Sequence, residues 1–392
     1  MKTPLLLLGD GPFEPTGLGR IARDLGRLLA THFPDAIDLL QVGGPAGVYW
    51  PEWRHLPLPE ADRVGDWGAA YVQGVYRSVW GDRPGILWGV WDPARLFPYL
   101  SIDLPVDRWA YVAIDGQNIQ GTIGGPAAEV IRRCERVVAY GRWGREVLRP
   151  IRAEVGWIPH GIDLEPWGDV READQDWVAR WVGPAWKPDH QTLIGCVATN
   201  QARKDLGLFC HTLRTLLDRG HPVFGWLHTD TLVKAWSVPQ LIEDFGLGRH
   251  LRVSGTDQAV GEDLLAAAYR SCSVTIAPGL AEGFGYPIVE SLAAGTPVVH
   301  VDHGGGRDLL PKAAWRFPVR EMRLEGTYGL QRPVCRAEDV ANAIERVWDW
   351  QGQVGERIAR GYCRGAVAHL GWESLQGRWT GWVRHGLEGR DG

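Results

Sequence analysis

The sequence lacks the features that would place the protein in a membrane or in an oxidising compartment. No run of 18 or more apolar residues exists, so no transmembrane helix is expected. The N-terminus has one lysine and four consecutive leucines before polar and turn residues, which predicts a buried strand and not a secretory signal. The six cysteines include no Cys-x-x-Cys pair, which favours reduced thiols. These absences predict a cytoplasmic protein without membrane insertion.

A strong positive charge is absent as well. The net charge of −5 argues against indiscriminate coating of nucleic acid, although it leaves room for one basic face. Lysine is scarce, at positions 2, 187, 204, 234 and 312 only, whereas Arg, Gly, Ala and Trp are abundant. That profile is typical of a GC-rich genome, so the 21 tryptophans are weak evidence for a stacking surface.

The length of 392 residues allows two domains of ordinary size, each with its own core. Strand-like and helix-like segments alternate along the chain, which predicts an α/β protein with parallel sheets covered by helices. Strands are expected at Pro4–Leu8, Trp109–Ile114, Val137–Tyr140, Leu193–Thr199, Val223–His228, Leu251–Ser254, Val274–Ala277 and Pro297–Val301. Helices are expected from Leu18 to Leu29 and at Trp143–Arg152, Asp205–Asp218, Val238–Phe245, Gly261–Ser271, Ala337–Trp350, Val354–Ala368 and Trp372–His385.

The most informative segment is PGLAEGFGYPIVESLAAGTPVV at 278–299, a glycine-rich turn between a strand and a short helix. Gly283 and Gly285 let the backbone pass close to a ligand. The amides of Gly283, Phe284, Gly285 and Tyr286 are expected at the helix N-terminus, where unpaired N–H groups and the helix dipole favour an anion. An ordinary glycine-rich turn is the alternative.

Two glutamates accompany this turn, Glu282 at its mouth and Glu290 in the helix. Carboxylates beside a phosphate-binding turn suit sugar hydroxyls better than the phosphate itself. Arg203 and Lys204, just after another strand, are two fixed cations suited to a diphosphate leaving group, whose charge grows in the transition state. Solvated side chains are the alternative for both pairs.

Glu-x7-Glu with Gly-Phe-Gly and a proline between resembles the donor site of retaining GT-B glycosyltransferases of the family 4 group, and WIPHGIDLEPW at 157–167 resembles their hinge. The resemblance implies a GT-B fold: two doubly wound Rossmann-like domains facing a cleft, with the C-terminal helix crossing back. It implies an acceptor-side domain at 1–156, a nucleotide-sugar-binding domain at 157–368 and a returning helix at 369–392.

By the same resemblance, the donor is a nucleotide sugar, expected to be a UDP-sugar, and no metal is required. The phosphates would rest on the 283–286 amides, Arg203 and Lys204. Glu290 would hold the ribose, and Glu282 would position the sugar as a catalytic residue. Separately from the resemblance, the position of Ser254 after a short strand predicts that its backbone holds the base edge.

The resemblance also assigns residues outside this motif. The loop GDGPFEPTGLGR at 9–20 would bring Gly17 and Gly19 to the donor phosphates, although it lacks the Gly-x-Gly-x-x-Gly spacing of a dinucleotide site. Asp115, after an N-domain strand, would contact the transferred sugar. A plain turn is the alternative at both places. Gly304-Gly305-Gly306 resembles the glycine loop beside the sugar.

Other patterns favour no competing chemistry. Asp174-Gln175-Asp176 resembles an Asp-x-Asp metal motif, but no strand precedes it. His300 and His303 straddle a strand end without a carboxylate or Cys partner, which argues against zinc. No Gly-x-Ser-x-Gly motif indicates an acyl intermediate.

One arginine pattern bears on the identity of the acceptor. Arg142, Arg145, Arg149 and Arg152 are expected on one helix face, where they would suit a phosphate backbone. A solvated face is the alternative. CVATNQARKDL, WLHTD and the 278–299 motif are similar to bacteriophage glycosyltransferases, some of which modify hydroxymethylated pyrimidines in DNA.

The first hypothesis is therefore transfer to 5-hydroxymethylcytosine in phage DNA, in the host cytoplasm. The alternatives are a polysaccharide, lipid or small-molecule acceptor, or a nucleotide-sugar epimerase or hydrolase on the same fold.

Overall fold

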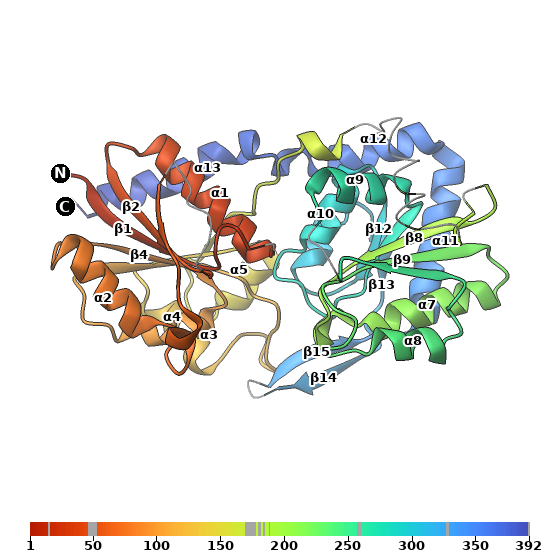
Figure 1. The fold of residues 1–392 in the computed structure, drawn as a ribbon, viewed down its shortest axis with the longest axis horizontal. Helices are drawn as coiled ribbons and strands as arrows, with labels where there is room; N and C mark the ends of the chain where they lie inside the picture. Colours follow the sequence, from red (N-terminus) through yellow and green to blue (C-terminus); the bar gives the residue numbers. More distant parts are fainter. Residues whose placement is uncertain are drawn as a thin grey trace. The chain divides into compact units, whose positions relative to one another are not determined.

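The structure is a computed structural model of the chain. It describes residues 1–14, 16–45, 53–168, 178, 182, 185–187, 189–256, 260–326 and 329–390. The chain divides into two compact units (Figure 1). The first comprises Met1–Gly161, Gly326–Leu330 and Trp372–Gly392, and the second comprises Ile162–Glu325 and Gln331–Gly371.

The first unit is built on a seven-stranded sheet in the order β3-β2-β1-β4-β5-β6-β7, with every neighbouring pair parallel. Its strands are β1 (Thr3–Leu8), β2 (Ile37–Val42), β3 (Arg54–Leu56), β4 (Gly85–Trp91), β5 (Val106–Val112), β6 (Arg136–Ala139) and β7 (Gly156–Trp157). Its helices include α1 (Gly17–His32), α2 (Ala69–Trp80), α3 (Pro93–Leu96), α4 (Gly125–Arg133) and α5 (Arg142–Leu148), with short turns η1 (Glu60–Arg63) and η2 (Phe97–Leu100). Strand β4 is buried at every position, as a parallel strand covered on both faces should be.

The second unit is built on a six-stranded parallel sheet in the order β10-β9-β8-β11-β12-β13. Its strands are β8 (Thr192–Val197), β9 (Val223–His228), β10 (Leu251–Ser254), β11 (Val274–Ala277), β12 (Val298–Val301) and β13 (Arg316–Phe317), with a separate pair β14 (Glu321–Glu325) and β15 (Leu330–Val334). Its helices include α7 (Leu206–Asp218), α8 (Val238–Asp244), α9 (Glu262–Ser271), α10 (Tyr286–Ala293), α11 (Ala337–Val354) and α12 (Glu356–Val367). Its short turns include η3 (Glu165–Trp167), η4 (Ala202–Lys204), η5 (Gly305–Leu309), η6 (Ala313–Trp315) and η7 (Ala368–Leu370).

The last helix, α13 (Trp372–Glu388), belongs to the first unit and packs on its sheet. The ring of Trp382 lies 5.1 Å from that of Trp88 in β4 and 5.2 Å from that of Trp109 in β5. The guanidinium of Arg136 lies 4.3 Å from the centre of the Trp382 ring, a cation–π contact. The predicted fold of two doubly wound parallel sheets with a returning C-terminal helix is therefore confirmed.

Some elements were not among those predicted. Strands β2, β3 and β4 were not predicted, although β4 is a continuous apolar run that is typical of a buried strand. The helix predicted at Trp143–Arg152 ends early, at Leu148. Pro150 explains the end, because a proline has no backbone N–H with which to continue the helical hydrogen bonds.

Two further findings concern the described part of the chain. No helix there is long and apolar enough to cross a membrane. All six cysteines are free thiols, of which only Cys335 is not fully buried.

Candidate functional site

The order of strands in the second sheet indicates where a ligand binds. Strand β8 is followed in the sheet by β9 on one side and β11 on the other, so the chain changes direction between β8 and β11. In parallel sheets, ligands bind at such a switch point, outside the carboxyl ends of the strands. Two segments named from the sequence follow these two strands: the turn η4 and the glycine turn that precedes α10.

A cluster of charged side chains lies at this switch point. The Lys204 ammonium donates a hydrogen bond to Oε1 of Glu282. Nη1 of Arg203 lies 3.7 Å from Oε2 of Glu282 and donates a hydrogen bond of 3.1 Å to the carbonyl of Ala281. The two cations and the first glutamate of the sequence prediction therefore meet in one place.

The three charges act on one another in a buried setting. The side chains of Lys204 and Glu282 are each 11% exposed. Burial acts to raise the pKa of Glu282, but the charges of Lys204 and Arg203 outweigh burial, so the pKa lies below its ordinary value. Glu282 is thus ionised at neutral pH, and the three side chains sum to a net charge of +1, which favours an anionic ligand.

The backbone after Lys204 is fixed by an unusual residue. Asp205 has a φ of +41°, in the left-handed region that aspartate tolerates better than most residues. Its carboxylate accepts a hydrogen bond of 3.0 Å from the amide of Leu208 and so caps α7. This turn links β8 to α7 and carries the two cations.

Two glycine turns meet on the other side of the cluster. Gly285 precedes α10 with a φ of +104°, which favours glycine, and a proline occupies the first turn of the helix. The amide of Gly305 donates a hydrogen bond of 2.8 Å to the carbonyl of Glu282. A Cβ on Gly305 would lie only 2.6 Å from the carbonyl oxygen of Gly283. The turns at 282–285 and 304–306 are therefore packed directly against each other.

The remaining candidates of the second unit are also held by hydrogen bonds. Glu290 is buried in α10, where Oε2 accepts a hydrogen bond of 3.1 Å from the hydroxyl of Tyr269. Ser254, at the end of β10, accepts a hydrogen bond of 2.8 Å from the Trp226 indole, and its Oγ lies 3.1 Å from Nδ1 of His228. Tyr269 and His228, which were not predicted as site residues, are thus hydrogen-bond partners of two predicted ones.

The candidates of the first unit lie after β1 and β5. Gly17 is exposed and Gly19 is buried in the first turn of α1, where the hydroxyl of Thr16 accepts a hydrogen bond of 2.9 Å from the Gly19 amide. A Cβ on Gly19 would lie 2.5 Å from the carbonyl oxygen of Glu14, so this turn requires glycine. Asp115 is half-buried in the loop after β5.

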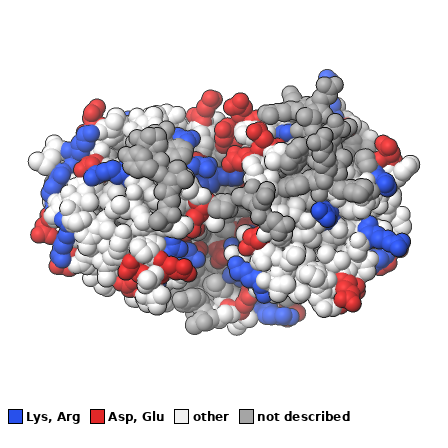
Figure 2. Space-filling model, viewed as in Figure 1, with Lys and Arg blue, Asp and Glu red and all other residues white. Residues whose placement is uncertain are grey.

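The predicted arginine face is wrong as a single helix face. Helix α5 ends at Leu148, so Arg149 only caps it and Arg152 lies beyond it. Arg152 donates hydrogen bonds to the carbonyls of Cys134 and Glu135. Arg145 and Arg149 lie 3.8 and 3.6 Å from the Glu146 carboxylate. On the face shown in Figure 2, basic and acidic side chains are interspersed.

The motifs set aside in the sequence analysis have separate outcomes. Asp174 and Asp176 lie outside the described residues. Within the described part of the chain, no group of three or more His, Cys, Asp or Glu side chains could hold a metal ion. His300, considered there only as a metal ligand, lies wholly buried beside the charged cluster.

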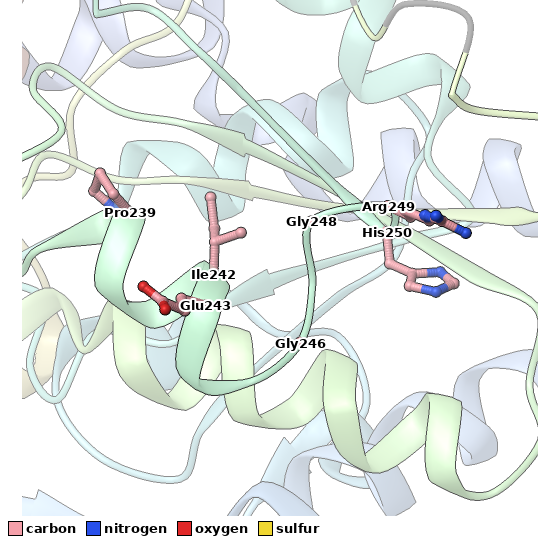
Figure 3. A pocket seen from close by; sticks show the side chains of 7 residues that line it. All are labelled: Pro239, Ile242, Glu243, Gly246, Gly248, Arg249 and His250. Atoms are coloured by element: carbon pink, nitrogen blue, oxygen red, sulfur yellow. The ribbon is translucent and has the colours of Figure 1, made fainter.

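A surface hollow of about 390 Å³ lies elsewhere in the second unit (Figure 3). It is lined by Pro239, Ile242 and Glu243 of α8 and by Arg249 and His250, which lead into β10. These residues lie at the amino end of β10, whereas the charged cluster lies at the carboxyl ends of β8 and β11. The hollow is therefore separate from the candidate site.

Solved structures resemble the whole chain. The structure of HepE from Anabaena in complex with UDP and glucose superposes with a TM-score of 0.72 at 14% identity, covering 98% of this chain and 100% of that one. The fold is GT-B. At this identity the likeness concerns the fold alone.

Sequence relatives point to one class of enzyme. The family described as "Glycosyl transferases group 1" matches residues 237–322, which include the glycine turn and both glutamates. A phosphatidyl-myo-inositol mannosyltransferase of Mycolicibacterium smegmatis is 30% identical over 230 residues, 56% of this chain and 54% of the relative. A D-inositol 3-phosphate glycosyltransferase of Mycobacteroides abscessus is 36% identical over 105 residues, 27% of this chain and 19% of the relative. The chain thus spans about half the length, or less, of these curated relatives. The family and both relatives are described as glycosyltransferases, which is the class of enzyme that the sequence predicted.

Proposed function

We propose that this GT-B protein is a retaining glycosyltransferase that moves a sugar from a nucleoside diphosphate donor to an acceptor hydroxyl. The observation that carries the proposal is the cluster of Arg203, Lys204 and Glu282 at the β8/β11 switch point, beside the amino end of α10. Two cations and a helix N-terminus suit a diphosphate, and a fixed carboxylate next to them suits the hydroxyls of the attached sugar.

Each residue of the second unit has a part in this proposal. Arg203 and Lys204 oppose the charge that develops on the leaving diphosphate, together with the amides of the turn at 283–286. Glu282 orients the sugar, and Glu290, held by Tyr269, takes the ribose hydroxyls. The backbone at Ser254 takes the edge of the base. From the first unit, we assign Gly17 and Gly19 to the phosphates and Asp115 to the sugar by family resemblance.

The proposed reaction breaks the bond between the anomeric carbon and the phosphate oxygen. The acceptor hydroxyl attacks from the same face, and its proton passes to the departing phosphate oxygen, so the anomeric configuration is retained. The cations and helix amides stabilise the leaving group in place of a metal. UDP is the expected nucleotide, and the solved complex of HepE with UDP is compatible with that choice.

For the acceptor, the alternatives to DNA have the better support. Both curated relatives are named for inositol-containing substrates, one a phosphate ester and one a lipid. The four arginines do not form one face, and Arg152 is engaged by backbone carbonyls. A hydroxyl of a polyol phosphate, a lipid head group or a polysaccharide is therefore favoured over 5-hydroxymethylcytosine in DNA.

One experiment tests these assignments together. The protein is incubated with a panel of UDP- and GDP-sugars and with inositol phosphates, phosphatidylinositol vesicles, oligosaccharides or hydroxymethylcytosine DNA, in the presence and absence of EDTA. Mass spectrometry detects the product, and NMR gives its anomeric configuration. We expect a retained glycoside on a polyol hydroxyl, with or without EDTA. A glycosylated nucleoside would restore the DNA hypothesis. Donor cleavage with no glycoside in any arm would favour a hydrolase, and an altered free nucleotide sugar would favour an epimerase.

A further inference from the structure

His300 is a buried histidine whose two ring nitrogens differ in their hydrogen bonding. It pairs with Ala277 across β12 and β11, and its side chain is 0% exposed. Nδ1 lies 2.7 Å from the carbonyl oxygen of Ala277, so Nδ1 carries the ring hydrogen and Nε2 is the bare nitrogen. Among the described residues, Nε2 has no hydrogen-bond partner. Buried polar atoms are usually hydrogen-bonded.

The ring lies where the glycine turns and the charged cluster converge. A Cβ on Gly306 would lie 2.6 Å from Nε2 and 2.7 Å from the Ile288 side chain, so the ring packs against the turn at 304–306. The charged groups that act on the ring are Glu282 from the first glycine turn and Lys204 from η4, and the backbone of His303 faces it from beyond β12. A positive charge on the ring would therefore fall beside the bond between Lys204 and Glu282.

We propose that His300 is a positioning residue for Glu282. Its ring must stay neutral so that the Glu282 carboxylate keeps its contacts with Lys204 and Arg203. A proton on Nε2 would repel Lys204 and attract Glu282, which would draw the carboxylate away from the position in which it orients the sugar. This inference rests on the proposed glycosyl transfer.

The setting favours the neutral ring at ordinary pH. Burial lowers the pKa of His300, and this outweighs the carbonyl of Ala277, the charge of Glu282 and the backbone of His303, which raise it. Because the pKa lies below the ordinary histidine value of 6.5, the charged ring is populated only at pH values below 6.5. Transfer should fall with that protonation, whereas affinity for the nucleoside diphosphate should hold, because Lys204 keeps its charge.

The first test compares pH profiles of kcat and of nucleoside diphosphate binding for the wild type and His300→Asn. Asparagine keeps a donor for the Ala277 carbonyl but takes no proton. At pH 7.5 we expect kcat to fall by about threefold, because asparagine does not fill the volume of the ring. In the wild type, kcat should fall at low pH (the acid limb of the profile), and His300→Asn should lose this fall. His221→Asn, at a histidine before the amino end of β9, is the control and should keep the fall of kcat at low pH.

Two results would overturn the inference. One is an acid limb that is the same in the wild type and in His300→Asn. The other is a folded but inactive His300→Asn protein whose activity returns in His300→Gln, since glutamine places a polar atom where Nε2 lies. That result would make the nitrogen itself, and not its neutrality, the requirement.

A second readout needs no substrate and separates this inference from the proposed function. The side-chain carboxyl of Glu282 is observed by 13C NMR in protein labelled at glutamate and assigned with Glu282→Gln. In the wild type the signal should show an added step as His300 is protonated, and His300→Asn should remove that step. Identical titrations would refute the positioning role even in an active enzyme. A coupled titration without sugar transfer from any donor would refute the proposed function alone.

Discussion

At the scale of the residue, the pair of Lys204 and Glu282 links the fold to the proposed chemistry. Both side chains are buried, and each is the hydrogen-bonded partner of the other. Removing one partner of a buried ion pair leaves the other charge buried without a counter-charge. This usually lowers the free energy of unfolding more than removing both partners does. The loss of activity and the loss of stability on substitution can therefore be separated by comparing single and double variants.

Lys204→Met should lower kcat at least about 100-fold, because one well-placed donor to a developing charge contributes roughly 3–4 kcal/mol. It should also lower the free energy of unfolding by about 3 kcal/mol, near the low end for a broken buried pair, because Arg203 still faces Glu282. The double variant Lys204→Met/Glu282→Gln should regain stability in urea denaturation but no activity. Near-wild-type turnover in the folded single variant would remove Lys204 from the site.

The two glutamates should separate by kinetic parameter. Glu290→Gln should weaken binding of the nucleoside diphosphate by about tenfold or more, the usual effect of losing a charged hydrogen bond. Glu282→Gln should mainly lower kcat. Tyr269→Phe removes one hydrogen-bond donor to Glu290 and should give a smaller loss of affinity. Calorimetry that finds unchanged affinity for both glutamate variants would contradict the assignment.

At the scale of the element, the sequence predicted what local chemistry decides. Strand β11, the glycine turn and α10 follow from residues within one short segment, and β11 has the bounds predicted for it. The pairing of Lys204 with Glu282 joins residues 78 apart and depends on β8 lying beside β11, which no local pattern states. His300 was overlooked because its function comes from neighbours in two other segments. The arginine face failed because spacing was counted through a proline.

The contact between the two glycine turns should be sensitive to a single methyl group. Gly305→Ala places a Cβ 2.6 Å from the Gly283 carbonyl, so the turns must separate. We expect a loss of about 1–3 kcal/mol in unfolding free energy, typical of overpacking, and weaker donor binding. Gly352→Ala is the matched control. It lies inside α11 with nothing within 4 Å of the added Cβ, and it should stabilise the protein by about 0.5–1 kcal/mol. Equal effects on donor binding would show that the turns do not form the site.

At the scale of the whole molecule, stability should depend on buried neutral histidines in both units. Burial lowers the pKa of five rings below the ordinary value. They are His55, His160, His228, His300 and His303. The pKa values of His228 and His303 fall to about 4. The lowered pKa of Glu282 acts in the same direction below its ordinary value of 4.5, whereas the raised pKa values of Asp24 and Asp205 oppose it above 3.8.

The sign of the resulting pH dependence follows from proton counting. Between pH 6.5 and about 4, the unfolded chain binds protons at these histidines that the folded chain does not, so the free energy of unfolding falls as pH falls. A ring that is neutral in the folded state and charged in the unfolded state contributes a slope of up to about 1.4 kcal/mol per pH unit. Urea denaturation at pH 7.5, 6.0 and 5.0 should therefore show a progressive loss of stability. His228→Asn removes one such ring and should flatten the slope below pH 6.5, whereas Gly352→Ala, which changes no titratable group, should leave it unchanged. A slope that is equal in all three proteins would mean that His228 accepts its proton in the folded state as readily as in the unfolded chain.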